Sequence, residues 1–270
     1  MLGLGLSRIK SGIVPSGLPV FVNASIQNDR GFHFDGSGDS LSVADHDDFS
    51  FATPSGSNPD SPFSWVGWIK MDVATGSYGI IAKAAASNYE YRVLFTSKVL
   101  IADTYAPVGG TIDYDRKQKT NQGNVNWTHW AITFSGETGD WTFYKNGTAL
   151  TGLTSGGSSN SDRGDMENSG SAFRLGSLQD SQAGFDFAGI MMQCILYNKE
   201  LRAEEVTYLY AGGAAHRDPR FQTTTYAAHN NVVAWWPLDD ANGHLDHGPN
   251  GHDFTKNGDV DLDTSADAPF

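Results

Sequence analysis

The sequence has a single cysteine, Cys194, among 270 residues, so no disulfide can form within the chain. Cys194 lies in the apolar stretch 189–197, without a basic neighbour that would lower the pKa of its thiol. We therefore expect a buried structural thiol rather than a nucleophile. The sequence also lacks any run that approaches the roughly 18 consecutive apolar residues of a membrane-spanning helix, which predicts no membrane insertion.

Basic residues are few. The chain has 18 Lys and Arg against 31 Asp and Glu, for a formal net charge of −13. A surface of this sign repels phosphate backbones and anionic membranes, so we expect no nucleic-acid partner. The first ten residues carry their positive charges after a short apolar run, the reverse of the order in a signal peptide. The sequence therefore predicts synthesis in the cytoplasm without a signal peptide.

Glutamate is also scarce, and its positions do not indicate catalysis. A glycoside hydrolase needs two carboxyl groups about 5 to 9.5 Å apart, commonly at alternating positions of one strand. Glu90 alone lies near a predicted strand, and no second acid follows it two or four residues later. His129 lies within another predicted strand without a partnered nucleophile, so we expect a structural histidine. These patterns predict a protein that is not an enzyme.

Aromatic residues and glycine are abundant, and they fall in strand-like segments. Apolar and polar positions alternate with period two, and turn-forming residues flank each segment, as in the strands of a sheet. The predicted strands are 63–71, 89–96, 98–103, 128–135, 140–145 and 186–197. The strongest turn signal is Asn146-Gly147, because both residues tolerate the positive φ of a type I′ hairpin turn. The one predicted helix, 201–210, ends before Gly212.

Six motifs with aromatic residues, four of which also contain glycine, occur in a characteristic order along the chain. They are residues 34–41 (FDGSGDSL), 63–68 (FSWVGW), 127–131 (WTHWA), 141–147 (WTFYKNG), 173–176 (FRLG) and 203–210 (AEEVTYLY). In this order and at these intervals they resemble the laminin-G-like, concanavalin-A-like jelly-roll family. The resemblance implies an all-β protein, an antiparallel jelly-roll β-sandwich with one short helix. This chain adds extended terminal arms, and we expect an N-terminal arm (1–19), a jelly roll (20–225) and a C-terminal strand segment (226–270).

The C-terminal segment departs from the family's order. Residues 232–239 look like the family's opening strand, which normally precedes the 34–41 motif, but here they come last. A segment this short cannot bury its apolar residues alone, so it must pack on something else. It either completes its own sandwich, exchanges with a neighbouring subunit, or is the start of a second domain. The closeness of the termini in compact domains favours the first alternative.

Tryptophans supply candidate contact residues. In related domains the motifs that hold Trp65, Trp68, Trp127, Trp130 and Trp141 pack the sandwich, so the resemblance implies that these residues lie in the core. Trp235 and Trp236 are adjacent, and on one strand they must face opposite sides. We therefore expect one of them to be exposed or covered by a partner, as a glycan or partner contact.

Three aspartates are candidate metal ligands. Many members of the resembling family bind calcium through carboxylates at one rim of the sandwich, and calcium requires six to eight oxygen ligands. The resemblance implies Asp39 as a ligand, with Asp35 and Asp186 as further candidates. The alternative is that Asp35 and Asp39 stabilise an Asx-type turn, which requires no metal.

The N-terminal arm suggests assembly. Leu2, Leu4, Leu6 and Ile9 are too few for an amphipathic helix and too apolar for a free tail, so we expect them to contact a partner. One hypothesis is a virion structural protein of a tailed bacteriophage, which decorates the capsid or belongs to an external appendage. Its partners would be the major capsid or appendage protein and further copies of the chain as a homo-oligomer. The alternative is a lectin-like module that binds polysaccharide, with or without calcium, for adhesion or receptor binding.

Overall fold

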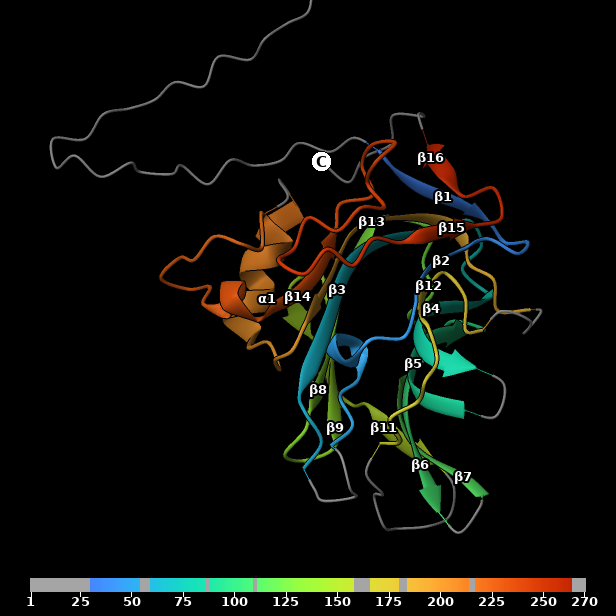
Figure 1. Cartoon of the computed structure of the whole chain (residues 1–270), viewed down its shortest axis with the longest axis vertical. Coiled ribbons are helices and arrows are strands. Elements are labelled where there is room, and N and C mark those ends of the chain that lie inside the picture. The colour runs from blue at the N-terminus through green and yellow to red at the C-terminus, as the bar shows by residue number, and fades with distance from the viewer. Residues whose placement is uncertain are drawn as a thin grey trace, which may run out of the picture.

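A computed structural model describes residues 30–53, 59–85, 88–108, 111–157, 166–179, 184–213 and 217–263. Two antiparallel sheets face each other and enclose one large apolar core (Figure 1). This architecture confirms the predicted jelly-roll sandwich. Within the described residues, no helix is both long enough and apolar enough to cross a membrane.

The first sheet is built around β13 (Ala188–Tyr197). Its strand order is β10 (Thr148–Ala149), β9 (Asp140–Lys145), β8 (Thr128–Ser135), β3 (Phe63–Met71), β13, β1 (Gly31–Asp35) and β16 (Asp261–Asp263), and β14 (Val232–Trp236) also pairs with β13. Nearly every residue of β3 and β13 is buried, because both faces of this sheet are covered. Such strands show continuous apolar runs rather than strict alternation.

The second sheet lies across the core from the first. Its order is β11 (Thr154–Gly157), β7 (Thr111–Lys119), β6 (Val99–Val108), β5 (Asn88–Thr96), β4 (Ser77–Ala85), β12 (Phe173–Leu175), β2 (Ser40–Val43) and β15 (Thr255–Asn257). The predicted strands correspond to β3, β5, β6, β8, β9 and β13. The predicted hairpin also forms between β9 and β10, where Asn146 has φ 49° and Gly147 has φ 76°. Both values are in the left-handed region that a type I′ turn requires.

The helix α1 (Ala203–Tyr210) covers the outer face of the first sheet. Its buried residues Val206 and Leu209 pack in a second apolar cluster with Tyr197 and Trp235. The helix begins with a reciprocal cap, in which the Arg202 N–H donates to the Glu205 carboxylate at 3.0 Å. The chain then turns at Ala211, whose φ of 52° ends the helix slightly before the predicted glycine.

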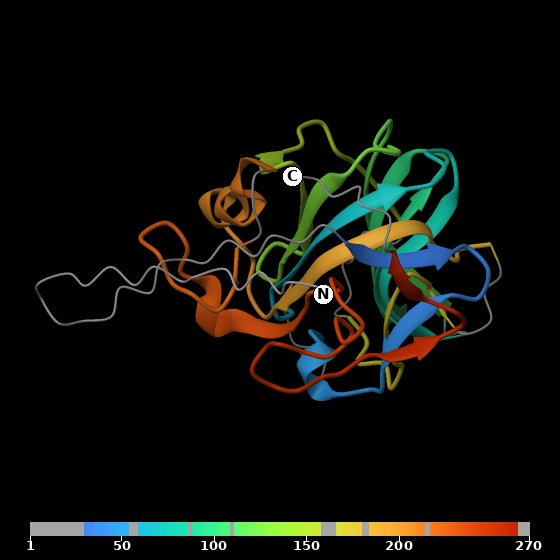
Figure 2. The ribbon, with the colours of Figure 1, turned by 90° about the horizontal axis from the view of Figure 1, so that it is seen from above.

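The C-terminal segment packs on its own chain. Strand β14 pairs with β13, β15 pairs with β2, and β16 pairs with β1. Figure 2 shows these last strands (red) beside the first strands of the described chain (blue). The segment therefore adds strands to both sheets of the sandwich, the arrangement that the closeness of termini favours. The expected assembly residues Leu2, Leu4, Leu6 and Ile9 lie outside the described residues.

Candidate functional site

A polar groove lies between the turn after β2 and the start of β14. It encloses about 360 Å³, within the size range of small-ligand sites. Its lining residues are Asp47, Asp48, Ser50, Phe51, Ser61, Asn198, Asn230, Val232, Val233, Pro249 and Asn250. Phe51, Val232 and Val233 are buried, whereas most of the polar residues are exposed. The groove thus has an apolar floor and walls of carboxylates, amides and hydroxyls.

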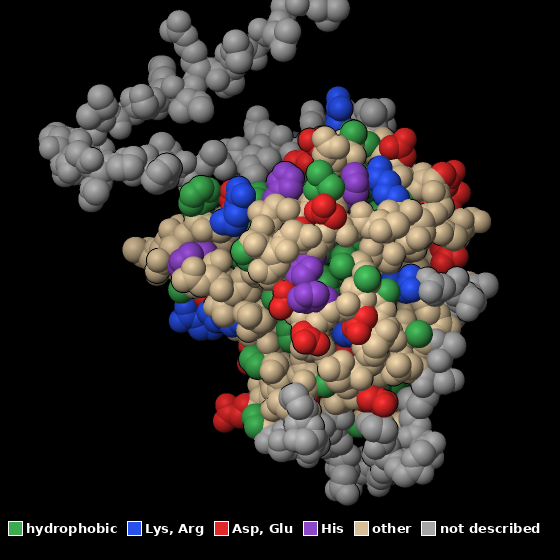
Figure 3. Space-filling view, in the orientation of Figure 1, with side chains coloured by type: hydrophobic (Ala, Val, Ile, Leu, Met, Phe, Trp, Pro, Cys, Tyr) green, Lys and Arg blue, Asp and Glu red, His purple; other side chains and the backbone are tan. Residues whose placement is uncertain are grey.

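The short 3-10 helix η1 (Asp47–Phe49) places the acidic wall. His46 caps it by accepting the Asp48 N–H at its Nδ1, with an N to N distance of 3.1 Å. The Phe49 ring is fully buried in the main core and anchors the turn. In the view of Figure 1, η1 lies near the middle of the molecule, and Figure 3 shows histidine and acidic side chains gathered in that area of the surface.

The opposite wall comes from the C-terminal half of the chain. Asn250 donates its amide to the carbonyl of Val233 at 3.1 Å, and Asn231 donates to the Asn198 carbonyl oxygen at 3.0 Å. The first bond fixes the wall to the strand β14, and the second, which ends at the side-chain Oδ1 of Asn198, joins the residue before β14 to the residue after β13. The Asp47 carboxylate, the Asn230 amide and the Ser61 hydroxyl make no hydrogen bond to another described residue. These three groups are therefore available to a ligand in the groove.

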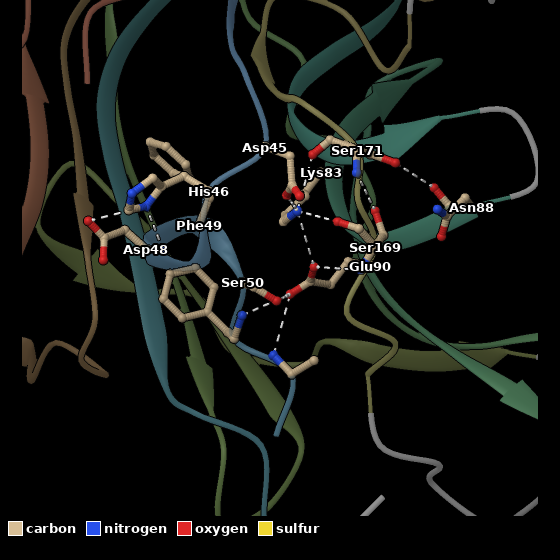
Figure 4. A network of polar contacts seen from close by, with 12 residues as sticks. Asp45, His46, Asp48, Phe49, Ser50, Lys83, Asn88, Glu90, Ser169 and Ser171 are labelled. Carbon is tan, nitrogen blue, oxygen red and sulfur yellow. Dashed lines mark hydrogen bonds and ion pairs between the residues drawn. The ribbon is translucent and has the colours of Figure 1, made fainter. Parts of the chain in front are cut away.

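A buried ionic network supports the groove from behind (Figure 4). Lys83 Nζ lies 2.5 Å from Asp45 Oδ1 and 3.7 Å from Glu90 Oε2, and both Lys83 and Glu90 are fully buried. Glu90 Oε1 also accepts from the Ser50 hydroxyl and from the Phe51 N–H, at 2.9 and 2.8 Å. Burial raises the pKa of Glu90, and the Lys83 charge opposes the shift. Glu90 therefore positions the chain that forms the groove's wall.

Two of the three predicted calcium residues, Asp35 and Asp39, lie together at another rim, whereas Asp186 is not part of their carboxylate cluster. Asp39 is buried and accepts the N–H groups of Asp35 and Asp259, both at 2.9 Å, and burial raises its pKa. Asp186 accepts from the Gly38 N–H at 3.1 Å. Carboxylate oxygens of Asp35, Asp39 and Asp259 lie within 4.8 Å of one another. This all-oxygen donor set fits a hard cation, while the hydrogen bonds at Asp39 match the turn alternative.

The expected contact role of Trp235 and Trp236 requires correction. Their relative exposures are 1% and 0%, so neither ring has a face open to a sugar. The two residues face opposite sides as expected, but both sides are covered by the chain itself. Trp235 packs in the cluster under α1 and donates to Gln193, whereas Trp236 lies in the main core and donates to the carbonyl of His252.

Two residues predicted to be structural are buried. His129 stacks edge-on against Trp68, with ring centroids 5.2 Å apart, and burial lowers its pKa to about 3. The ring is therefore neutral at physiological pH. It packs against the aromatic rings of Trp68 and Tyr210, which is a structural role. Cys194 is fully buried, and burial raises the pKa of its thiol. A protonated, inaccessible thiol is not a nucleophile.

The outer face of the second sheet carries a second polar surface. Arg92, Asp103 and Arg116 stand directly opposite one another on β5, β6 and β7. Asp103 Oδ2 lies 2.9 Å from Arg92 Nε, and Asp103 Oδ1 lies 2.7 Å from Arg116 Nε. Tyr105 stacks on Tyr89 beside this row, with ring centroids 4.9 Å apart. The carboxylate is fully buried, so the row mainly joins the three strands.

A match over most of the sequence shows the family to which the chain belongs. The sequence matches the concanavalin A-like lectin/glucanases superfamily over residues 21–207. The chain belongs to this superfamily, which confirms the resemblance of its motifs. No curated protein matches the chain.

One solved structure shares the fold, and others are similar to the chain. A candidate carbohydrate binding protein from Bacteroides ovatus is 18% identical, with 88% of this chain and 60% of that protein covered and a TM-score of 0.56. The heptameric SAP-like pentraxin from Limulus polyphemus is 13% identical, with 79% and 93% covered and a TM-score of 0.42. The binding domain of botulinum neurotoxin serotype D is 16% identical, with 66% and 41% covered and a TM-score of 0.46. This chain thus spans about 60% of the length of the Bacteroides protein.

The residues of the groove were not predicted from the sequence. Asp47 and Asn230 look like ordinary loop residues, and Asn250 lies in a turn-forming stretch. Nothing local marks them, because β14 brings the two walls together by pairing with β13. The one signal in the sequence was the segment 232–239, which resembles the family's opening strand but comes last in this chain. Its pairing with β13 determines where the groove forms.

Proposed function

We propose that the chain is a carbohydrate-binding protein whose ligand lies in the groove between η1 and β14. The observation that carries this proposal is the combination of free polar groups over an apolar floor. Asp47, Asn230 and Ser61 offer a carboxylate, an amide and a hydroxyl that have no hydrogen-bond partner in the part of the chain that the structure describes. A sugar ring presents hydroxyls that both donate and accept, and apolar C–H faces that pack on aliphatic or aromatic side chains.

Membership of a superfamily of lectins and glucanases supports this proposal. The Bacteroides protein with the same fold is also described as a candidate carbohydrate binder. We propose binding without cleavage. Glu90, behind the groove, is buried and accepts backbone and hydroxyl hydrogen bonds, and the two acids that line the groove, Asp47 and Asp48, are adjacent in η1 on one wall rather than on either side of a bound sugar. The buried Glu90 cannot reach a glycosidic oxygen in the groove.

Binding can be tested with a panel of bacterial and plant polysaccharides, followed by titration calorimetry of the best ligand. We expect Asp47→Asn and Asn230→Ala each to weaken binding about tenfold, because the first replaces a charged acceptor by a neutral amide and the second removes an amide, each a change of about 1.5 kcal/mol. Asn242→Ala is the matched control, since this exposed asparagine lies outside the groove. Equal affinity in all three variants, or release of reducing ends from the polysaccharide, would contradict the proposal.

A Tyr114→Ala variant distinguishes the groove from the outer face of the second sheet. Tyr114 lies beside Tyr105, with ring centroids 5.8 Å apart, and Arg116 lies over its ring. This side chain is partly exposed, so it can stack on a sugar. Loss of binding in this variant, with retention in Asp47→Asn, would move the ligand to the outer face.

The structural role in a tailed-phage virion is a second proposal. It rests on residues 1–19, whose Leu2, Leu4, Leu6 and Ile9 are apolar and suited to a protein contact. We expect the full chain to form a discrete homo-oligomer or to bind virion proteins, and a chain without residues 1–19 to remain a folded monomer. Light scattering of both forms tests this role. The same number of chains per particle in both forms, with no binding to capsids by either form, would exclude it.

A further inference from the structure

A cluster of two histidines and one aspartate lies beside the groove. Asp48 Oδ2 is 2.7 Å from His252 Nε2 and 3.5 Å from His46 Nδ1. The two imidazole rings lie against each other, with centroids 4.7 Å apart and planes at 60°. One ligand atom from each of the three residues lies within 4.8 Å of the others. We propose that these residues form a binding site for a divalent transition-metal ion such as Zn²⁺.

The chemistry of the donors selects the ion. Two imidazole nitrogens and one carboxylate oxygen are the ligands of zinc and of neighbouring transition metals, whereas calcium and magnesium prefer oxygen alone. Three protein ligands leave the fourth position of a tetrahedral ion to water or to a ligand. The site therefore differs in kind from the all-oxygen cluster of Asp35, Asp39 and Asp259 at the other rim.

The fold positions two of the three ligands firmly. His252 is only 9% exposed, its N–H donates to Asp246 at 2.9 Å, and its carbonyl accepts from Trp236 at 2.7 Å. Its ring packs on Phe49, with centroids 4.7 Å apart. Asp48 is held in place because it lies within η1, directly before the buried Phe49. A site whose ligands are held by packing and hydrogen bonds loses little conformational freedom when an ion binds.

His46 supplies the open side of the site. Its side chain is 53% exposed, so an ion can enter from solvent without a change in the core. Its Nδ1 accepts the Asp48 N–H, and ligation of this nitrogen replaces that hydrogen bond. Ligation of His252 Nε2 replaces its 2.7 Å contact with Asp48 Oδ2 and releases the proton of that contact to solvent. Figure 4 shows His46 and Asp48 close together next to Phe49, on the opposite side of this turn from the buried Lys83 and Glu90.

The ion would join segments that are 204 residues apart in the sequence, and it would sit at the edge of the groove, because Asp48 also lines that groove. Metal binding to the native state alone stabilises it by mass action. The metal site does not depend on the proposed carbohydrate ligand. Zinc binding without polysaccharide therefore distinguishes failure of one proposal from failure of the other.

The experiment is titration of the tag-free full chain with ZnCl₂ by calorimetry, and with CoCl₂ by the visible absorption of four-coordinate Co²⁺. We expect one ion per chain and a higher Tm with zinc. His46→Gln, which alters an exposed side chain, should weaken binding at least about tenfold, the loss that even an outer-shell change can produce. Asp48→Asn should do the same, and circular dichroism checks that each variant is folded.

His33→Gln is the matched control. His33 is also a partly exposed histidine beside an aspartate, with Nε2 3.7 Å from Asp72, but among the described residues it belongs to no cluster of three metal-binding groups. We expect this variant to bind zinc as the wild type does. The proposal is overturned if the wild type takes up no zinc, if His46→Gln binds as tightly as the wild type, or if His33→Gln loses as much affinity as His46→Gln.

Discussion

His252 Nε2 and Asp48 Oδ2 lie 2.7 Å apart, although 204 residues separate them in the sequence. The contact joins the turn after β2 to the C-terminal segment, directly above the buried ring of Phe49. Phe49 in turn stacks near Trp236, with ring centroids 6.3 Å apart. The last strands of the chain are thus part of the same core as the first, and they form one wall of the candidate binding groove.

The packing of Trp236 predicts that the C-terminal segment is required for folding. The indole ring is fully buried and stacks on Phe254 at 4.1 Å and on Phe173 at 5.8 Å. Trp236→Ala should lower the free energy of unfolding by about 3 to 5 kcal/mol, because it opens a cavity in the core. Urea unfolding measures this loss. Phe221→Ala, at a residue 40% exposed, should change stability little, and a similarly small effect of Trp236→Ala would show that the segment packs elsewhere.

Buried His129 predicts a loss of stability at acid pH. Burial lowers its pKa to about 3 in the folded chain, against about 6.5 when unfolded. The unfolded chain therefore takes up the proton first, so the contribution is complete above pH 6.5 and falls as the pH drops toward 3. Between pH 6.5 and 5 the loss is about 2 kcal/mol. His129→Phe keeps the packing on Trp68 and should reduce this loss in urea unfolding, whereas His33→Gln, at a partly exposed histidine, should retain it.

The strands were predictable because their signals are local. In β3 the aromatic residues and the period-two pattern mark residues 63–71, and in the β9–β10 hairpin Asn146-Gly147 alone determines the turn. The groove depends instead on which strands pair. Asn230 and Asp47 meet because β14 adds to β13, and that choice of partner is not encoded in the residues that line the groove.

The same reason explains the candidate calcium rim. Asp35 and Asp39 are close in sequence and were identified from their motif, but Asp259 is 220 residues from Asp39. Its position follows from the strands β15 and β16, which pair with β2 and β1. The expected exposure of Trp235 or Trp236 failed for a related reason: alternation shows which residues face opposite sides, but not that α1 covers one of those sides.

The buried ion pair behind the groove predicts a pH-dependent variant. Lys83→Met removes the positive charge 3.7 Å from buried Glu90 and should cost about 3 to 5 kcal/mol at pH 7. The pKa of Glu90, already raised by burial, should rise further. Because the folded chain then binds a proton more readily than the unfolded chain, the deficit should shrink as the pH falls. Urea unfolding at pH 7 and 5 tests this, and the double variant Lys83→Met/Glu90→Gln should recover part of the loss at pH 7.

Calcium binding at the rim of Asp35, Asp39 and Asp259 remains a prediction with a clear test. Burial raises the pKa of Asp39, and the negative charge of Asp35 adds to the shift, so an ion there would relieve carboxylate repulsion. We expect Ca²⁺ to raise the Tm and a chelator to reverse the rise, by the mass-action stabilisation of the native state. Asp259→Ala should abolish the response, because it removes one ligand while the N–H of residue 259 still caps Asp39. Asp186→Asn should have a smaller effect, since that carboxylate already accepts from Gly38. An unchanged Tm with calcium and with chelator would leave the turn as the whole role of Asp35 and Asp39.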